Sequence, residues 1–170
     1  MLIRDLASFL TDPGPTLRTG LRQRLAAGVG LALVRVWLAW PFATAGWHRV
    51  FTWDAQEFLF TQVHPVPLLP ATIAAPLTTG AEISLSLLLI LGLAGRVGAA
   101  GLAVMAATLF LVIGRTPEGL ENGIAIAAEQ VPWVLAGAAL FVLGPGMLSV
   151  DAAWHSLRRR GAVPSPTPLR

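Results

Sequence analysis

The run AEISLSLLLILGLAGR, residues 81–96, is apolar over a length that crosses much of a bilayer, yet it carries one carboxylate. A carboxylate inside a membrane costs several kcal/mol unless it is protonated, paired or facing a water-filled cavity. We therefore expect Glu82 to have a partner elsewhere in the chain. The position of that partner determines how the helices are arranged.

The composition is typical of an integral membrane protein. Of the 170 residues, 55% are hydrophobic and 12% charged, whereas a soluble domain carries about 25% charged residues. The mean hydropathy is +0.68. All twelve basic residues are arginines, and most of them lie at the edges of apolar segments rather than on one basic face, so we expect no binding of nucleic acid. The absence of cysteine excludes disulfides, thiolate metal sites and cysteine-ligated iron–sulfur clusters.

The hydrophobic pattern predicts an all-α membrane protein, a bundle of four transmembrane helices over residues 26–42, 71–94, 97–114 and 131–143. Residues 118–130 could form an interfacial helix or the start of the fourth span. Glycines recur every third residue across the turn between the second and third spans, at Gly92, Gly95, Gly98 and Gly101. Small residues allow close helix approach, so we expect a tight hairpin there.

The flanking segments complete a three-part organisation. Residues 1–24 form an N-terminal cytoplasmic segment, whose first ten residues are either a short interfacial helix or a disordered tail. Residues 25–152 form the membrane domain, with an aromatic-rich external loop over 50–70 and an interfacial helix at about 54–63. Residues 153–170 form a basic tail containing Pro and Ser. Asp151, two residues after Ser149, is expected at a helix terminus.

The arginines also predict the orientation of the chain. Most of them flank the N-terminal segment, the second turn and the tail: Arg18, Arg22, Arg24, Arg96 and Arg158 to Arg160. The other two loops hold Arg49 and Arg115 together with most of the carboxylates. The positive-inside rule then places both termini in the cytoplasm. We expect a multi-pass protein of the plasma membrane, the inner membrane of a bacterium.

Arg35 is the basic residue deepest in a predicted span, and it is the predicted partner of Glu82. Counting along the helices places Arg35 roughly 13–14 Å and Glu82 roughly 18 Å from the cytoplasmic side, at 1.5 Å per residue. The gap is about one helical turn, which an arginine side chain can bridge. The pair could be purely structural, or it could line a site for a ligand or a proton.

A second polar group lies in the predicted external region. Its members are His48, Arg49, Asp54, Glu57 and His64. Histidine and carboxylate ligands can bind zinc or copper, but the spacing matches no compact ligand motif, so no metal site is predicted. The sequence also lacks the nucleophile-elbow, phosphate-loop, dinucleotide and zinc-protease motifs. No catalytic residue is predicted.

Four motifs spanning residues 25–152 are informative in combination. They are Arg35-Val36-Trp37, Ala45-Gly46-Trp47-His48-Arg49, the run 81–96, and Gly144-Pro145-Gly146-Met147-Leu148-Ser149-Val150-Asp151. Together they resemble the DoxX family of four-helix membrane proteins. Members commonly carry a lysine after the glycine near the end of the first helix, where this chain has His48 and Arg49. An arginine keeps the charge but not the point geometry of an ammonium.

The resemblance implies a membrane subunit or adaptor of a redox module, a set of proteins that transfer electrons together. Any activity would belong to a quinone-linked oxidoreductase complex, and a quinone would contact Arg35 and Glu82 through its carbonyls. The implied partners are the lipid bilayer, a soluble or membrane-bound redox protein, and a second copy of the chain. Two other classes remain open. One is a small proton-coupled transporter or channel-like bundle using Glu82, and the other is a non-catalytic assembly or scaffold protein.

Overall fold

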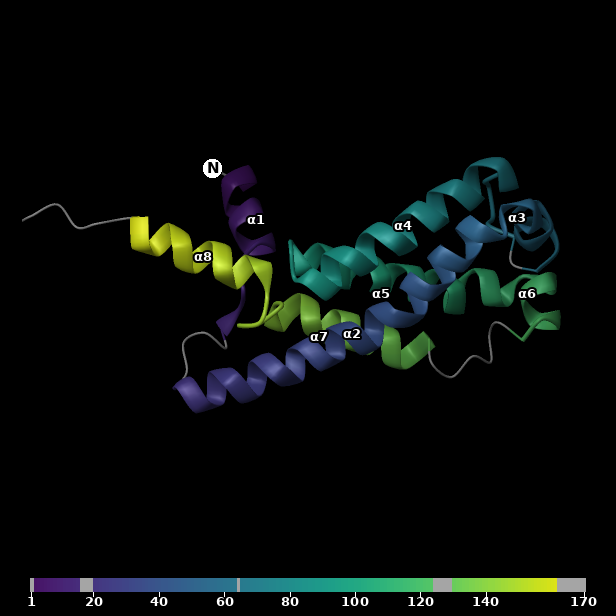
Figure 1. Ribbon diagram of the computed structural model, residues 1–170. Helices are drawn as coiled ribbons and strands as arrows, with labels where there is room; N and C mark the ends of the chain where they lie inside the picture. The colour runs from purple at the N-terminus through teal and green to yellow at the C-terminus, as the bar shows by residue number, and fades with distance from the viewer. Residues whose placement is uncertain (1, 16–19, 64, 124–129, 162–170) are drawn as a thin grey trace, which may run out of the picture.

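The computed structural model describes residues 2–15, 20–63, 65–123 and 130–161, and these residues contain helices and no β-strand (Figure 1). In chain order the elements are α1 (Leu2–Leu10), α2 (Leu21–Phe51), η2 (Trp53–Ala55), α3 (Gln56–Phe58), η3 (Leu59–Val63), α4 (Ala71–Leu91), α5 (Gly95–Leu111), η4 (Ile113–Arg115), α6 (Pro117–Glu121), α7 (Gln130–Leu143) and α8 (Val150–Gly161). The predicted all-α membrane class is confirmed.

Among the described residues, three helical segments are long and apolar enough to cross a membrane: Leu21–Phe51, Ala71–Leu91 and Gly95–Arg115. The fourth apolar helix, α7, has 14 residues, so the four-span count stays a prediction. The first span is longer than predicted. It continues through Pro41 to Phe51, because spanning helices tolerate proline when the freed backbone groups find other partners. At about 46 Å, α2 exceeds the roughly 30 Å hydrocarbon core.

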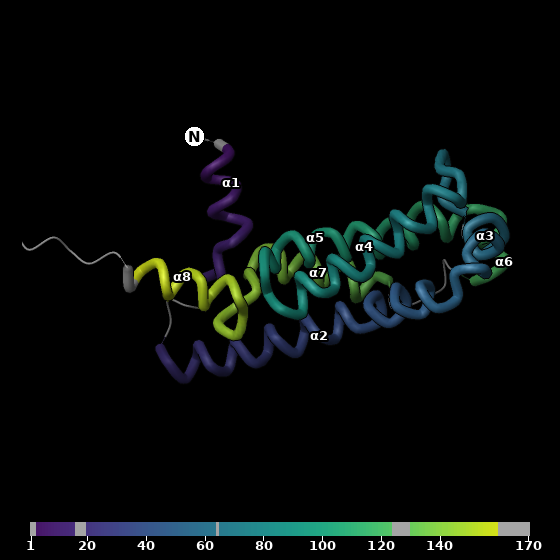
Figure 2. Tube along the Cα trace, turned by 45° about the horizontal axis from the view of Figure 1, so that its top comes forward, coloured from purple at the N-terminus to yellow at the C-terminus, as the bar shows by residue number. Residues whose placement is uncertain are grey.

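The helices α2, α4, α5 and α7 lie side by side, and the short elements lie at the two ends of this bundle (Figures 1 and 2). The α3 and α6 helices cover one end. The N-terminal helix α1 and the C-terminal helix α8 project from the other end, where the turn between α4 and α5 also lies. The bundle therefore brings both described chain ends to one side, as the predicted topology requires, although the assignment of that side to the cytoplasm stays a prediction.

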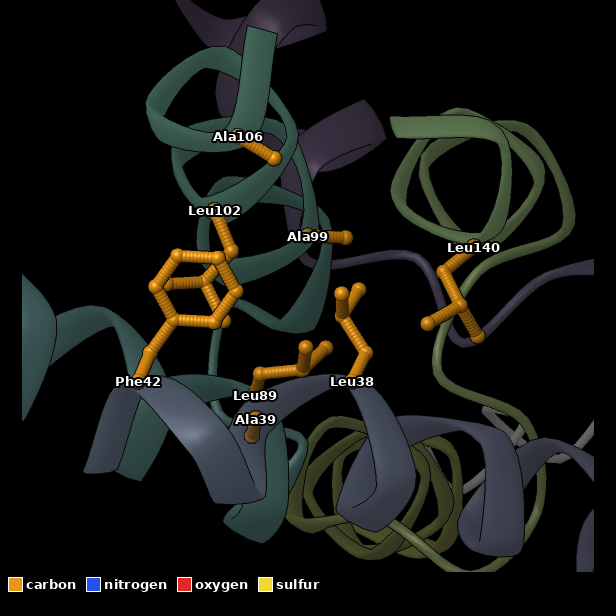
Figure 3. Packing of buried hydrophobic residues seen from close by; sticks show 8 residues of the cluster. All are labelled: Leu38, Ala39, Phe42, Leu89, Ala99, Leu102, Ala106 and Leu140. Atoms are coloured by element: carbon orange, nitrogen blue, oxygen red, sulfur yellow. The ribbon is translucent and has the colours of Figure 1, made fainter. Parts of the chain in front are cut away.

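The core of the bundle lies where α2, α4, α5 and α7 meet (Figure 3). Its buried members are Leu38, Ala39, Phe42, Leu89, Ala99, Leu102, Ala106 and Leu140. Alanines supply three of these positions, so the backbones approach closely. On α2, Phe42 lies four residues after Leu38 and three after Ala39, which places these side chains on one face of the helix. The opposite face carries exposed tryptophans suited to lipid.

The predicted glycine-lined hairpin between α4 and α5 is confirmed. Gly98 of α5 faces the α4 backbone, and a Cβ there would lie 2.8 Å from the Leu89 nitrogen and 2.9 Å from the Leu85 oxygen. Gly92 ends α4 with a φ of 65°, and Ala94 has a φ of 46°. This left-handed pair reverses the chain within a few residues. The hairpin thus fixes α5 against α4 before any side chain from another helix is considered.

The flanking predictions are confirmed in part. Residues 2–10 form a helix, so the alternative of a disordered tail is wrong there. The aromatic-rich loop contains three successive short helical elements, η2, α3 and η3, which together cover the whole of the predicted helix 54–63. The predicted tail begins inside α8, and its last nine residues, 162–170, lie outside the described part of the chain. Residues 124–129 do as well, so the connection from α6 to α7 is not described.

Gly46 lies where α2 packs closely against α4, and its substitution provides a test of the packing. A Cβ there would lie 2.8 Å from Ile83 Cγ1 and 3.1 Å from Glu82 Cβ. We expect Gly46→Ala to lower the free energy of unfolding by about 1–3 kcal/mol through overpacking. Gly30→Ala, on the same helix with nothing within 4 Å, should change it by less than about 1 kcal/mol. Unfolding in detergent by titration with dodecyl sulfate measures both, and equal effects would contradict the packing.

Candidate functional site: two buried charge clusters

Glu82 pairs with Arg49, near the end of α2. The Arg49 Nη1 donates to Glu82 Oε1 at 2.8 Å, and the two side chains are only 14% and 6% exposed. The Arg49 guanidinium also lies over the Phe60 ring, with Cζ 5.2 Å from the ring centroid. The loop after α2 therefore covers the pair, because η3 brings Phe60 onto the Arg49 guanidinium. We call this group the outer cluster.

The predicted pair between Arg35 and Glu82 is wrong. Arg35 lies at the level of Gly92, because a Cβ on Gly92 would overlap the Arg35 Nη1 atom. Gly92 follows Glu82 by ten residues on α4, which is roughly 15 Å of helix rise. The depths predicted for Arg35 and Glu82 were wrong because they assumed that residue 26 lies level with the end of the predicted second span. The α2 helix in fact overhangs that end by several turns.

The α2 sequence explains why Arg49 can reach inward. Gly46 lies one turn before Arg49 on the buried face of α2, and its missing side chain lets α4 approach at Glu82 and Ile83. The arginine side chain then extends along this contact to the carboxylate. The sequence placed Arg49 in the predicted external polar group and did not predict it as the partner of Glu82. The feature of the sequence that could have indicated this pair is Gly46, three residues before Arg49, because a glycine there allows another helix to come close.

Three buried oxygen atoms on one face of α4 lack hydrogen-bond partners among the described residues. They are Thr79 Oγ1, Glu82 Oε2 and Ser86 Oγ, at positions separated by three and four residues. By contrast, the exposed Ser84 hydroxyl on the same helix donates to the Gly80 carbonyl at 2.7 Å. Buried hydroxyls normally find partners. This polar line extends from Glu82 of the outer cluster in both directions along α4, and its two hydroxyls were not predicted from the sequence.

Arg35 joins a different group at the end of the bundle that carries α1 and α8. Its Nη2 donates to the Leu148 carbonyl in the segment before α8, and the side chain is 3% exposed. Gly92 leaves room for it by ending α4 without a side chain. Arg35 therefore ties α2 both to the turn between α4 and α5 and to the C-terminal segment. We call this group the inner cluster.

Asp151 completes the inner cluster by capping α5. Its carboxylate accepts hydrogen bonds from the backbone N–H groups of Ala94, at 2.9 Å, and Gly95, at 3.0 Å. Its own N–H donates to the Gly92 carbonyl at 3.0 Å. Burial raises the pKa of Asp151, and the two backbone donors and the nearby Arg35 guanidinium oppose that shift. An anion at a helix N-terminus is favourable. Asp151 lies in the first turn of its own helix α8, so the expectation that it lies at a helix terminus is confirmed, and its carboxylate also caps a second helix.

The rest of the segment 144–151 positions Asp151. Gly144 and Gly146 have φ values of 78° and 80°, which allow the chain to reverse after α7. The Gly146 N–H donates to the Pro13 carbonyl at 3.0 Å, so the turn before α2 packs here too. Ser149 caps α8, because its hydroxyl accepts from the Ala152 N–H at 3.1 Å. The motif thus acts as a joint between four helices.

The remaining predicted external residues do not converge. His48, Asp54 and Glu57 are exposed on α2, η2 and α3, and His64 lies outside the described residues. Within residues 2–15, 20–63, 65–123 and 130–161, no group of three or more His, Asp or Glu side chains could hold a metal ion. Of the five predicted external residues, the structure brings Arg49 to the buried carboxylate.

Glu82 and the level of Arg35 are separated by roughly 15 Å along α4. This separation decides whether a quinone, as the resemblance implies, could contact both residues. Arg35 and Glu82 do not face one another, and the described Nη2 bond of Arg35 goes to a backbone carbonyl. One quinone ring could not place its carbonyls on both charges. The predicted quinone site between these two residues therefore does not fit the structure.

These features define a class: a polytopic helical membrane protein whose apolar spans are joined by buried charges. The chain belongs to the DoxX family, because the model of that family matches residues 30–115, just over half of the chain. The match contains Arg35, Arg49 and Glu82 but not the joint at 144–151. No curated protein and no solved structure matched the chain.

Proposed function

We propose that this protein is an integral membrane subunit or adaptor of a redox module. The adaptor role rests on one observation: the buried charged side chains connect the helices to one another. Arg49 holds α2 to Glu82 of α4, Arg35 holds α2 to the C-terminal segment, and Asp151 caps α5. These groups connect helices and stiffen the bundle. The redox assignment rests on membership of the DoxX family.

The surface that an adaptor would present lies at the end with α1 and α8. Both helices project from the bundle (Figure 2) and expose apolar side chains, among them Ile3 at 83% and Leu157 at 61%. The inner cluster fixes the base of α8 through Asp151. A partner bound to α8 would therefore be held rigidly relative to the spanning helices.

A second function, proton transfer through the bundle, is favoured by the polar line on α4. Glu82 Oε2 and the Thr79 and Ser86 hydroxyls are buried without hydrogen-bond partners among the described residues, and Glu82 lies between the two hydroxyls on α4. An intramembrane carboxylate is a candidate proton carrier. The carboxylate is nevertheless held by Arg49, which favours a fixed negative charge. This reading therefore ranks second.

Purification of the full chain from its native membrane in mild detergent tests both functions. We expect an oxidoreductase to copurify and to reduce an electron-accepting dye with its own substrate. Trp154→Ala with Leu157→Ala on α8 should lower its recovery at least about threefold, a loss near 0.7 kcal/mol, whereas Leu135→Ala on the lipid-facing side of α7 should not. Recovery without oxidoreductase activity would contradict the redox role. Proton flux in liposomes that is lost in Glu82→Gln would favour the second function.

A further inference from the structure

A cavity of about 420 Å³ lies between the start of α2, the turn before it, and α8. Its lining includes Asp12, Arg24, His155 and Arg159. None of these side chains belongs to the outer or inner cluster. The cavity therefore needs a separate explanation, and its chemistry is that of an anion site with two arginines.

Arg24 has an unsatisfied donor at this cavity. Its Nε is buried and has no hydrogen-bond partner among the described residues. A guanidinium N–H that is removed from water without an acceptor is costly. Because the Nε atom is itself buried, an oxyanion in the cavity would be met by the terminal nitrogens of Arg24, and planar guanidinium groups suit phosphate oxygens particularly well.

Arg159 is held in position on the opposite wall. Its Nε donates to His155 Nε2 at 3.0 Å, one turn earlier on α8, which leaves the two terminal nitrogens of Arg159 for a ligand. Asp12 is the opposing charge, but its Oδ1 already accepts from the Gly14 N–H at 2.8 Å. The carboxylate therefore shapes the turn, and the two arginines leave the cavity with a positive balance.

The surroundings favour a lipid as the source of the anion. Arg24 directly precedes the apolar run of α2, where Leu25 and Val29 are 44% and 49% exposed. The α2 helix extends beyond the turn between α4 and α5 on this side, so a phosphate at Arg24 would lie on the water side of the spans, where the exposed Leu25 and Val29 would contact the lipid that carries it. We propose that this cavity binds the phosphate of an anionic phospholipid headgroup through Arg24 and Arg159. Basic groups flanking spans bind anionic lipids in this way.

Titration of the full-length protein in a neutral detergent tests the site. The probes are short-chain phosphatidylglycerol, phosphatidylcholine and inorganic phosphate, and the readouts are the thermal midpoint and the apparent Kd. We expect phosphatidylglycerol to raise the midpoint, and Arg24→Gln and Arg159→Gln each to weaken its binding about fivefold. Asp12→Asn, which keeps the oxygen that holds the turn, should strengthen it.

Arg158→Gln is the matched control, because Arg158 carries the same charge on the same helix but packs over the Trp154 ring instead. It should change the affinity less than twofold. An effect equal to that of Arg159→Gln would show only general attraction and overturn the site. Inorganic phosphate binding as tightly as the lipid would overturn the lipid source, and equal binding of phosphatidylcholine would overturn the charge selectivity. Arg159 is exposed, so its variant tests the site even if Arg24→Gln misfolds.

Discussion

Gly92→Ala is expected to lower the free energy of unfolding by about 3 kcal/mol or more, through two physical effects. The residue has a φ of 65°, a conformation that strains any side chain with a Cβ. The added methyl would also overlap Arg35 Nη1 and Ser149 Cβ, and it would lie 3.1 Å from Ser149 Cα. Because this last neighbour is backbone, the whole C-terminal joint must move.

Gly123→Ala separates the two effects. Gly123 has a φ of 71° but no atom within 4 Å of an added Cβ, so only the strain of about 1–2 kcal/mol applies. Unfolding in detergent gives both free energies. Limited trypsin digestion should show faster cleavage after Arg158 and Arg159 in Gly92→Ala only, because displacement of Ser149 loosens α8. Equal destabilisation by the two substitutions would show that the joint around Gly92 is not packed as described.

Arg49→Gln is expected to lower the free energy of unfolding by about 3–5 kcal/mol, because it leaves the Glu82 carboxylate buried without its partner. Adding Glu82→Gln removes that charge, so the double variant should be more stable than Arg49→Gln alone. The coupling energy in the double-mutant cycle should exceed about 1 kcal/mol. The same denaturant titration measures all four proteins of the cycle.

Arg35→Gln provides the matched comparison. Arg35 carries the same charge on the same helix, but its Nη2 donates to the Leu148 carbonyl. Its effect should add to that of Glu82→Gln within about 0.5 kcal/mol, as for residues without shared partners. A large coupling energy between Arg35 and Glu82, with none between Arg49 and Glu82, would contradict the structure. It would support the Arg35–Glu82 pair that the sequence predicted.

The sequence predicted the class of the protein and the contacts that are local in the chain. The hairpin of α4 and α5 could be found because its glycines are close in sequence and small residues have one strong effect on packing. The pairing of Glu82 could not, because it depends on the offset between two antiparallel helices. Pro41 and the tryptophans near it concealed the true end of α2, and an error of a few residues there shifts the whole register.

The same contrast applies to the rest of the site. Ser149 and Asp151 have the residue types of helix caps, and this was visible in the sequence. That Asp151 caps a helix 56 residues earlier in the chain follows only from tertiary structure. The unpartnered hydroxyls of Thr79 and Ser86 were likewise hidden, because serine and threonine in an apolar helix usually bond to their own backbone.

The long separation between Asp151 and α5 has a consequence for biosynthesis. The chain emerges from the ribosome N-terminus first, so α2, α4 and α5 enter the membrane before Asp151 has been made. Until then the N-terminal amides of α5 lack their carboxylate acceptor, and Arg35 lacks the Leu148 carbonyl. The segment that leads into α8 therefore completes the contacts of the bundle after the earlier helices are in place. A ribosome that stalled or terminated after α7 would release spans that are inserted but not locked, which gives membrane proteases a direct way to recognise an unfinished chain.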